Sequence, residues 1–82
     1  MNTNQLKKQT MTERELLQQL EEVKLQISNK DFWNQDTTEL RKKQIEICKA
    51  LVDLHPRKNE PYLREAWFSY YRFMDEKNQK TT

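Results

Sequence analysis

The sequence predicts an all-α fold, a small three-helix bundle with an up-down-up course and flexible termini. Three observations predict it. The 82 residues include no glycine, which hairpin turns and phosphate-binding loops use to reach positive φ. Apolar residues recur at helical spacing in three successive segments. The first two segments open with residue pairs typical of helix N-termini.

The first helix is expected over residues 12–29, after a polar arm of residues 1–11 that is expected to be flexible. Thr12 and Glu15 form a capping-box pattern at its start. The apolar residues then make one narrow stripe, consisting of Leu16, Leu20, Val23 and Ile27. Phe32 and Trp33 follow in a short loop, and we expect them to cover one end of the bundle.

The second helix is expected over residues 37–54, with Asp36 and Glu39 as a second capping pair. Its apolar face covers about half of the circumference and is formed by Leu40, Ile45, Ile47, Cys48, Leu51, Val52 and Leu54. His55-Pro56 is predicted to end this helix, because the residue before a proline is disfavoured in the α region. A basic loop over residues 56–59 would follow.

The third helix is expected over residues 60–78, with Pro61 in its first turn and a disordered tail over residues 79–82. Six of the eight aromatic residues of the chain lie between Tyr62 and Phe73 on this helix. One stripe is predicted to face the other two helices and comprises Leu63, Ala66, Trp67, Tyr70 and Met74.

A second stripe on the last helix is the predicted partner-binding surface. It consists of Arg64, Phe68, Tyr71 and Asp75, with Arg72 next to Phe68. The first helix has only a narrow apolar stripe, so the bundle is expected to leave some of these aromatic side chains exposed. Aromatic residues and arginine are enriched at protein interfaces, which makes this surface the best candidate for function.

The residues that would support catalysis are sparse, and we expect no enzymatic activity, metal or cofactor. His55 is the only histidine and stands at a helix end, where a cation interacts favourably with the helix dipole. Cys48 is the only cysteine and lies on an apolar helix face, where thiols are unreactive. No cysteine and histidine cluster has the spacing of a metal site.

Two basic clusters raise nucleic-acid binding as an alternative function. Arg41, Lys42 and Lys43 begin the second helix, and Arg57 and Lys58 follow its other end. Phosphate binding requires cations on one surface. At about 1.5 Å per residue, the two clusters lie more than ~20 Å apart. The cations at the helix start also oppose its dipole, which indicates that they serve a purpose other than helix stability.

The composition fits a small binding protein better than a nucleic-acid or membrane protein. The net charge is only +2, and 34% of the residues are charged. No segment is apolar enough for a signal sequence or a membrane span, so we expect a cytoplasmic protein, in its own cell or in a host cell. The predicted function is docking on a larger protein or nucleoprotein complex as a regulator or inhibitor. A phage or mobile-element origin is a hypothesis from composition alone, and a homodimer or assembly subunit is a further alternative.

Overall fold

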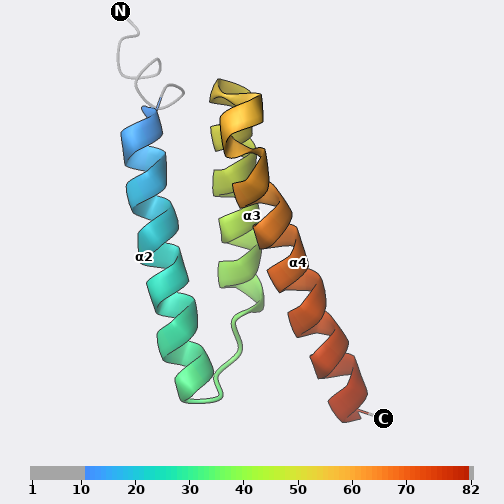
Figure 1. Ribbon diagram of the computed structural model, residues 1–82. Coiled ribbons are helices and arrows are strands. Elements are labelled where there is room, and N and C mark those ends of the chain that lie inside the picture. Colours follow the sequence, from blue (N-terminus) through green and yellow to red (C-terminus); the bar gives the residue numbers. More distant parts are fainter. Residues whose placement is uncertain (1–10, 82) are drawn as a thin grey trace, which may run out of the picture.

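The computed structural model describes the backbone of residues 11–81 and the side chains of residues 11–78. This part of the chain forms three helices and no strand: α2 (Glu13–Phe32), α3 (Thr38–Leu54) and α4 (Pro56–Thr81). The predicted all-α three-helix bundle is confirmed, since α2 and α4 run in one direction and α3 runs in the other (Figure 1). Residues 1–10 of the predicted arm, and Thr82 in the predicted tail, lie outside the described residues.

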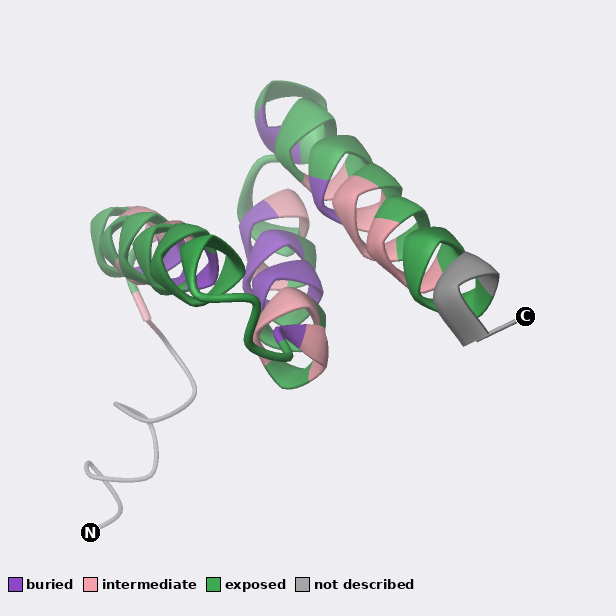
Figure 2. Cartoon of the chain, turned by 90° about the horizontal axis from the view of Figure 1, so that it is seen from below, coloured by how far each residue is buried: buried purple, intermediate pink, exposed green. Residues whose placement is uncertain are grey.

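The central helix of the bundle is α3. It packs against α2 on one side and α4 on the other, whereas no Cα atom of α2 comes within 8 Å of one in α4 in the described part of the chain. Seen along the helices, α3 stands at the corner between the other two, and the buried residues of α2 and α3 face each other (Figure 2). The bundle is therefore open along the side between α2 and α4, and the backbone of α4 packs only against α3.

The core forms where the predicted apolar stripes meet. Leu20 on α2 and Leu51 on α3 are 2% and 0% exposed, and burial of such a side chain stabilises the fold by about 1.5–3 kcal/mol. The buried apolar residues are Leu16, Leu20, Val23, Ile27, Ile45, Ile47, Cys48, Leu51 and Ala66. Only Ala66 comes from α4, so most of the fully buried apolar surface belongs to the contact between α2 and α3. Met11, predicted to be part of the arm, is partly buried against this core.

The predicted capping box at the start of α2 is confirmed. The backbone N–H of Glu15 donates to Thr12 Oγ1 over 3.1 Å, and the backbone N–H of Thr12 donates to Glu15 Oε1 over 3.0 Å. These two bonds satisfy two backbone donors that a helix start leaves without a partner. They fix the first residue of α2 close to the predicted position.

The expectation that Phe32 and Trp33 cover the end of the bundle is wrong. They are 77% and 71% exposed and contact each other edge to face, with ring centroids 5.2 Å apart. The reason is that α2 continues through Phe32 instead of ending at Asn29. Helical register then carries Phe32 to the outer side of α2, seven residues after the equally outward Leu25, which is 64% exposed.

Of the second predicted capping pair, Asp36 and Glu39, only Asp36 binds the start of α3. Asp36 Oδ1 accepts hydrogen bonds from the backbone N–H of Thr38 over 3.1 Å and from its hydroxyl over 2.7 Å. These bonds hold the pKa of Asp36 below its ordinary value. Glu39 does not return to the helix start but pairs with Lys42, at 3.7 Å. Leu54, expected in the apolar face, is 44% exposed at the last turn of α3.

Only His55 separates α3 from α4. The last helix begins at Pro56, four residues earlier than expected, and extends to Thr81, three residues beyond the expected end. Proline fits the first position of a helix because its missing N–H has no helical partner there. Pro56 rather than Pro61 takes this place, so Arg57 and Lys58 lie in the first turn of α4 and not in a loop.

Asn59 and Glu13 join the N-terminal ends of α4 and α2. Asn59 is fully buried, and its amide Nδ2 donates to the carbonyl of Leu51 over 2.8 Å and to Glu13 Oε2 over 3.2 Å. Lys58 also pairs with Glu13, at 3.2 Å. The bond from Asn59, with the charge of Lys58, holds the pKa of Glu13 below its ordinary value. This cluster fixes the position of α4 along the bundle axis relative to α2.

Arg41 joins all three helices at the opposite end of the bundle. Its Nη2 pairs with Asp31 Oδ2 on α2 over 2.7 Å, and its Nη1 donates to Ser69 Oγ on α4 over 2.5 Å. Its Nε donates to Thr37 Oγ1 over 2.8 Å, and its guanidinium lies over the ring of Phe73, 4.6 Å from the centroid. The side chain is only 11% exposed. Two of these contacts are with α4, so Arg41 helps to determine which side of α4 faces the bundle.

Substitution of Arg41 is therefore expected to destabilise the fold. Arg41→Ala removes charged hydrogen bonds to two other helices, and we expect a loss of about 2–3 kcal/mol in the free energy of unfolding. Urea unfolding followed by far-UV circular dichroism measures it. The control is Lys42→Ala at the next position, whose side chain is 53% exposed and whose loss should cost less than about 0.5 kcal/mol. Equal effects of the two substitutions would contradict the bridging role of Arg41.

Candidate docking surface on the last helix

The outer face of α4 carries two large exposed aromatic side chains. Phe68 is 66% exposed and Tyr71 is 61% exposed. On the inner face Ala66 is buried, and the other residues of the predicted inward stripe, Leu63, Trp67, Tyr70 and Met74, are partly buried. The inward and outward stripes therefore lie as the helical periodicity predicts, and the expected exposure of aromatic residues on α4 is confirmed.

Charged residues lie one turn before and after Phe68. Arg64 pairs with Glu60 over 2.6 Å, and Arg72 pairs with Glu76 at 3.8 Å, each four residues apart on the helix. Asp75 is exposed on the same face. The structure thus brings the five predicted partner-binding residues onto one continuous exposed surface, which we call the docking surface (Arg64, Phe68, Tyr71, Arg72 and Asp75).

Tyr71 is held in place by its aromatic neighbours. Its ring stacks on Trp67 with centroids 5.4 Å apart and 19° between the planes, and it contacts Tyr70 edge to face at 5.7 Å. Trp67 in turn lies under the ammonium group of Lys49 on α3, 5.8 Å from the ring centroid. An exposed ring fixed by such contacts loses little side-chain entropy on binding, which favours its use as an anchor.

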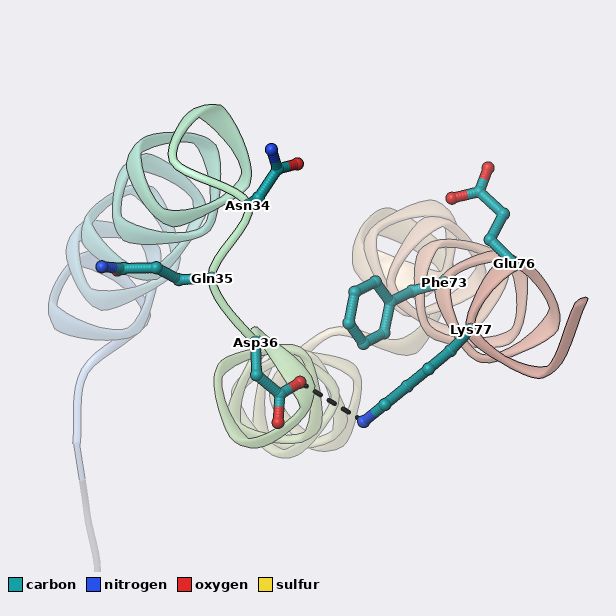
Figure 3. Close-up of a pocket in the computed structure, with 6 residues that line it drawn as sticks. All are labelled: Asn34, Gln35, Asp36, Phe73, Glu76 and Lys77. Atoms are coloured by element: carbon teal, nitrogen blue, oxygen red, sulfur yellow. Dashed lines mark ion pairs between the residues drawn. The ribbon is translucent and has the colours of Figure 1, made fainter. Parts of the chain in front are cut away.

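A shallow cavity of about 380 Å³ lies between the C-terminal part of α4 and the connection from α2 to α3 (Figure 3). Phe73 points into it from α4, and the ion pair between Asp36 and Lys77, at 3.5 Å, closes one side. Its remaining walls are Asn34, Gln35 and Glu76. Asn34 has φ of 58°, a left-handed conformation that asparagine tolerates and that turns the chain after α2. None of these six side chains forms a nucleophile and base pair with another.

The residues of the nucleic-acid alternative do not form one surface. Arg41 is largely buried in its contacts with Asp31 and Ser69, whereas Lys42 and Lys43 are exposed near the start of α3. Arg57 and Lys58 lie at the start of α4, at the other end of the bundle (Figure 1). Lys58 is paired with Glu13 and Lys42 with Glu39. The structure thus keeps the two basic clusters apart.

His55 and Cys48, the residues considered for catalysis or metal binding, lie in different surroundings, one exposed and the other buried. His55 is exposed, and its Nε2 lies 3.9 Å from Glu13 Oε1. Cys48 is 0% exposed, and burial raises the pKa of its thiol from 9.0 to about 11. Within residues 11–78, no group of three histidine, cysteine, aspartate or glutamate side chains is arranged to hold a metal ion. None of the helices described is long and apolar enough to cross a bilayer.

Comparisons with protein-family models, curated proteins and solved structures found no match to this chain. The function is therefore inferred from the geometry of the chain itself.

Several residues that position the docking surface are absent from the sites predicted from the sequence. Ser69 and Asn59 are polar residues on the inward side of α4, and such positions often carry a structural hydrogen bond. Their spacing relative to Ala66 could have marked them. The role of Asp31 is not predictable from the sequence. Its partner Arg41 is ten residues away, across a turn whose course the sequence does not reveal.

The raised pKa of Cys48 predicts a loss of stability at alkaline pH. Below about pH 9 the thiol is protonated in both states, so it causes no loss there. Between pH 9 and about 11 the unfolded state releases the proton while the folded state keeps it, and stability falls as pH rises. A shift from 9.0 to about 11 corresponds to roughly 2–3 kcal/mol.

Cys48→Ala is the comparison that isolates this effect, because the other titrating groups are the same in both proteins. We expect the stability advantage of the natural chain over the variant to shrink by roughly 2 kcal/mol between about pH 8 and about pH 11. Urea unfolding at a series of pH values measures it. A constant difference across this range would contradict the raised pKa.

Proposed function

We propose that the chain is a non-enzymatic binding protein that docks on a larger protein as a regulator or inhibitor, through the docking surface on α4. The observation that carries the proposal is the exposure of Phe68 and Tyr71 on a face of α4 that turns away from the bundle. Exposed aromatic side chains rimmed by charged groups are characteristic of protein-binding sites.

The arrangement of the surface supports this function. Phe68 projects from the side of α4 opposite Ala66, the residue that α3 buries, so a partner can reach most of the ring. Arg64 and Arg72 offer hydrogen-bond donors one turn away on each side. Binding in the cytoplasm, of its own cell or of a host, is part of this proposal and agrees with a single, buried thiol.

The nucleic-acid alternative has less support. Of its five basic residues, Arg41 is engaged within the bundle, and the others are divided between two ends. The docking surface carries two cations, Arg64 and Arg72, and each is paired with a glutamate, whereas phosphate binding requires several cations on one surface. A binding mode dominated by phosphate contacts would require a different surface.

The proposal predicts that the aromatic side chains carry most of the affinity. We expect Phe68→Ala together with Tyr71→Ala to weaken binding to the captured partner by at least about 30-fold, or 2 kcal/mol, because central aromatic anchors contribute this much. The partner is captured from nuclease-treated lysate with tagged protein and identified by mass spectrometry, and its affinity is then measured by titration calorimetry at two salt concentrations.

The matched control is Leu25→Ala, which removes an equally exposed apolar side chain, 64% exposed, from α2. It should change the affinity by less than about twofold, and far-UV circular dichroism should show all variants folded. Unchanged affinity of the double variant would reject the docking surface. Affinity that falls steeply with salt, or recovery lost on nuclease treatment, would favour nucleic acid instead.

A further inference from the structure

Arg64, Phe68 and Arg72 form one ridge on α4. They are four residues apart, so each arginine lies about 6 Å from Phe68 along the helix axis. All three project into solvent, with exposed fractions of 75% for the Arg64 side chain, 66% for Phe68 and 70% for the Arg72 side chain. From either end, the ridge presents a cation, then an aromatic ring, then a second cation.

Glu60 and Glu76 hold the two arginines from the outer ends of the ridge. The pairs measure 2.6 Å between Arg64 and Glu60 and 3.8 Å between Arg72 and Glu76. Exposed ion pairs contribute only about 0–1 kcal/mol, so the guanidinium groups can turn to another carboxylate at little cost. The ridge thus has one available cation on each side of a single apolar anchor.

We propose that the docking surface receives an α-helix of the partner protein that carries an apolar residue opposite Phe68 and a carboxylate one turn before and one turn after it. This inference depends on the proposed function and specifies the chemistry of the partner. Arginine binds carboxylates through two parallel hydrogen bonds, so the two arginines select for acidic residues at this spacing. The apolar residue between them is shielded from water by Phe68.

A helix fits this ridge for a geometric reason. Ridges of residues four apart pack into the grooves between equivalent ridges of another helix, at a crossing angle of about −50°. At such a crossing only the central turns are in contact, which matches the span from Arg64 to Arg72 and leaves Glu60 and Glu76 outside. Tyr71 lies three residues after Phe68, beside the ridge, and supplies the second anchor.

A second copy of the same ridge is a poor occupant. If two α4 helices crossed antiparallel on a two-fold axis at Phe68, Arg64 of each would face Arg72 of the other. Like charges placed opposite each other oppose association. The charge order that suits an acidic helix therefore disfavours the symmetric dimer.

The test is the selection of helical binders to the chain from a displayed library. A displayed library of small helical scaffolds, randomised over one helix face, is selected on the immobilised full-length chain, and binders are sorted by loss of binding to Phe68→Ala. We expect these binders to share acidic residues four positions before and after an apolar residue. They should bind the Arg64→Glu/Arg72→Glu variant at least about 100-fold more weakly, or about tenfold for each arginine.

Arg14→Glu is the matched charge reversal, because Arg14 is exposed on α2, away from the docking surface. It should change affinity by less than about twofold. Binders that need Phe68 but lack the acidic pattern, or that tolerate the reversed arginines, would overturn this inference and leave the proposed function standing. A library without binders dependent on Phe68 or Tyr71 would overturn both.

Sedimentation equilibrium of the chain alone completes the test. We expect a monomer at concentrations up to about 100 μM, a concentration at which weak self-association becomes detectable. Self-association that Phe68→Ala abolishes would identify a second copy as the occupant and overturn the inference.

Discussion

The rotation of α4 about its own axis depends on the polar contacts of Arg41 as well as on apolar packing. Within the described side chains of α4, Ala66 is buried in the apolar core, whereas Leu63, Trp67 and Tyr70 are only partly buried against it, so apolar burial leaves the rotation of this helix partly unconstrained. The guanidinium of Arg41 binds Ser69 and covers Phe73 on one side of α4, while Asp31 on α2 holds the same group in place. With Ser69 and Phe73 both turned toward Arg41 on α3, Phe68 lies about 100° and about 140° from them around the helix, on a side that faces away from α3. The exposure of the docking surface thus follows from this polar contact together with the packing of the apolar face of α4.

An open bundle supports this arrangement. Since the backbones of α2 and α4 do not approach each other, α2 cannot cover any part of the outer face of α4. The cluster of Glu13, Lys58 and Asn59 joins the two helices only at their N-terminal ends. The rest of α4 is a rigid rod supported on one side, and a rod of this kind binds through its free face with little rearrangement.

The helices and the exposure of Phe68 follow from the sequence, whereas the support of the docking surface does not. Helical periodicity reveals which residues of α2 and α4 share a face, and the narrow stripe from Leu16 to Ile27 reveals that α2 can cover little. The basic run at the start of α3 opposes the helix dipole. This indicates that these residues have a role other than helix stability, but it does not reveal which role. For Arg41 that purpose is the contact with Asp31 and Ser69, ten and twenty-eight residues away, and such contacts depend on how the helices are placed. The predicted end of α2 is wrong because its last turn lacks a strong stop signal, since no glycine follows it.

Hydroxyl-radical footprinting of the free protein tests the orientation of α4 most directly. The chain offers matched pairs of side chains with the same intrinsic reactivity: exposed Tyr71 against partly buried Tyr70, and exposed Phe68 against partly buried Phe73. If α4 is oriented as described, Tyr71 and Phe68 are oxidised faster than their counterparts, as read by mass spectrometry, and the difference is smaller in Arg41→Ala. Equal or reversed rates in the natural chain would mean that α4 is rotated and that its aromatic side chains are not presented as described.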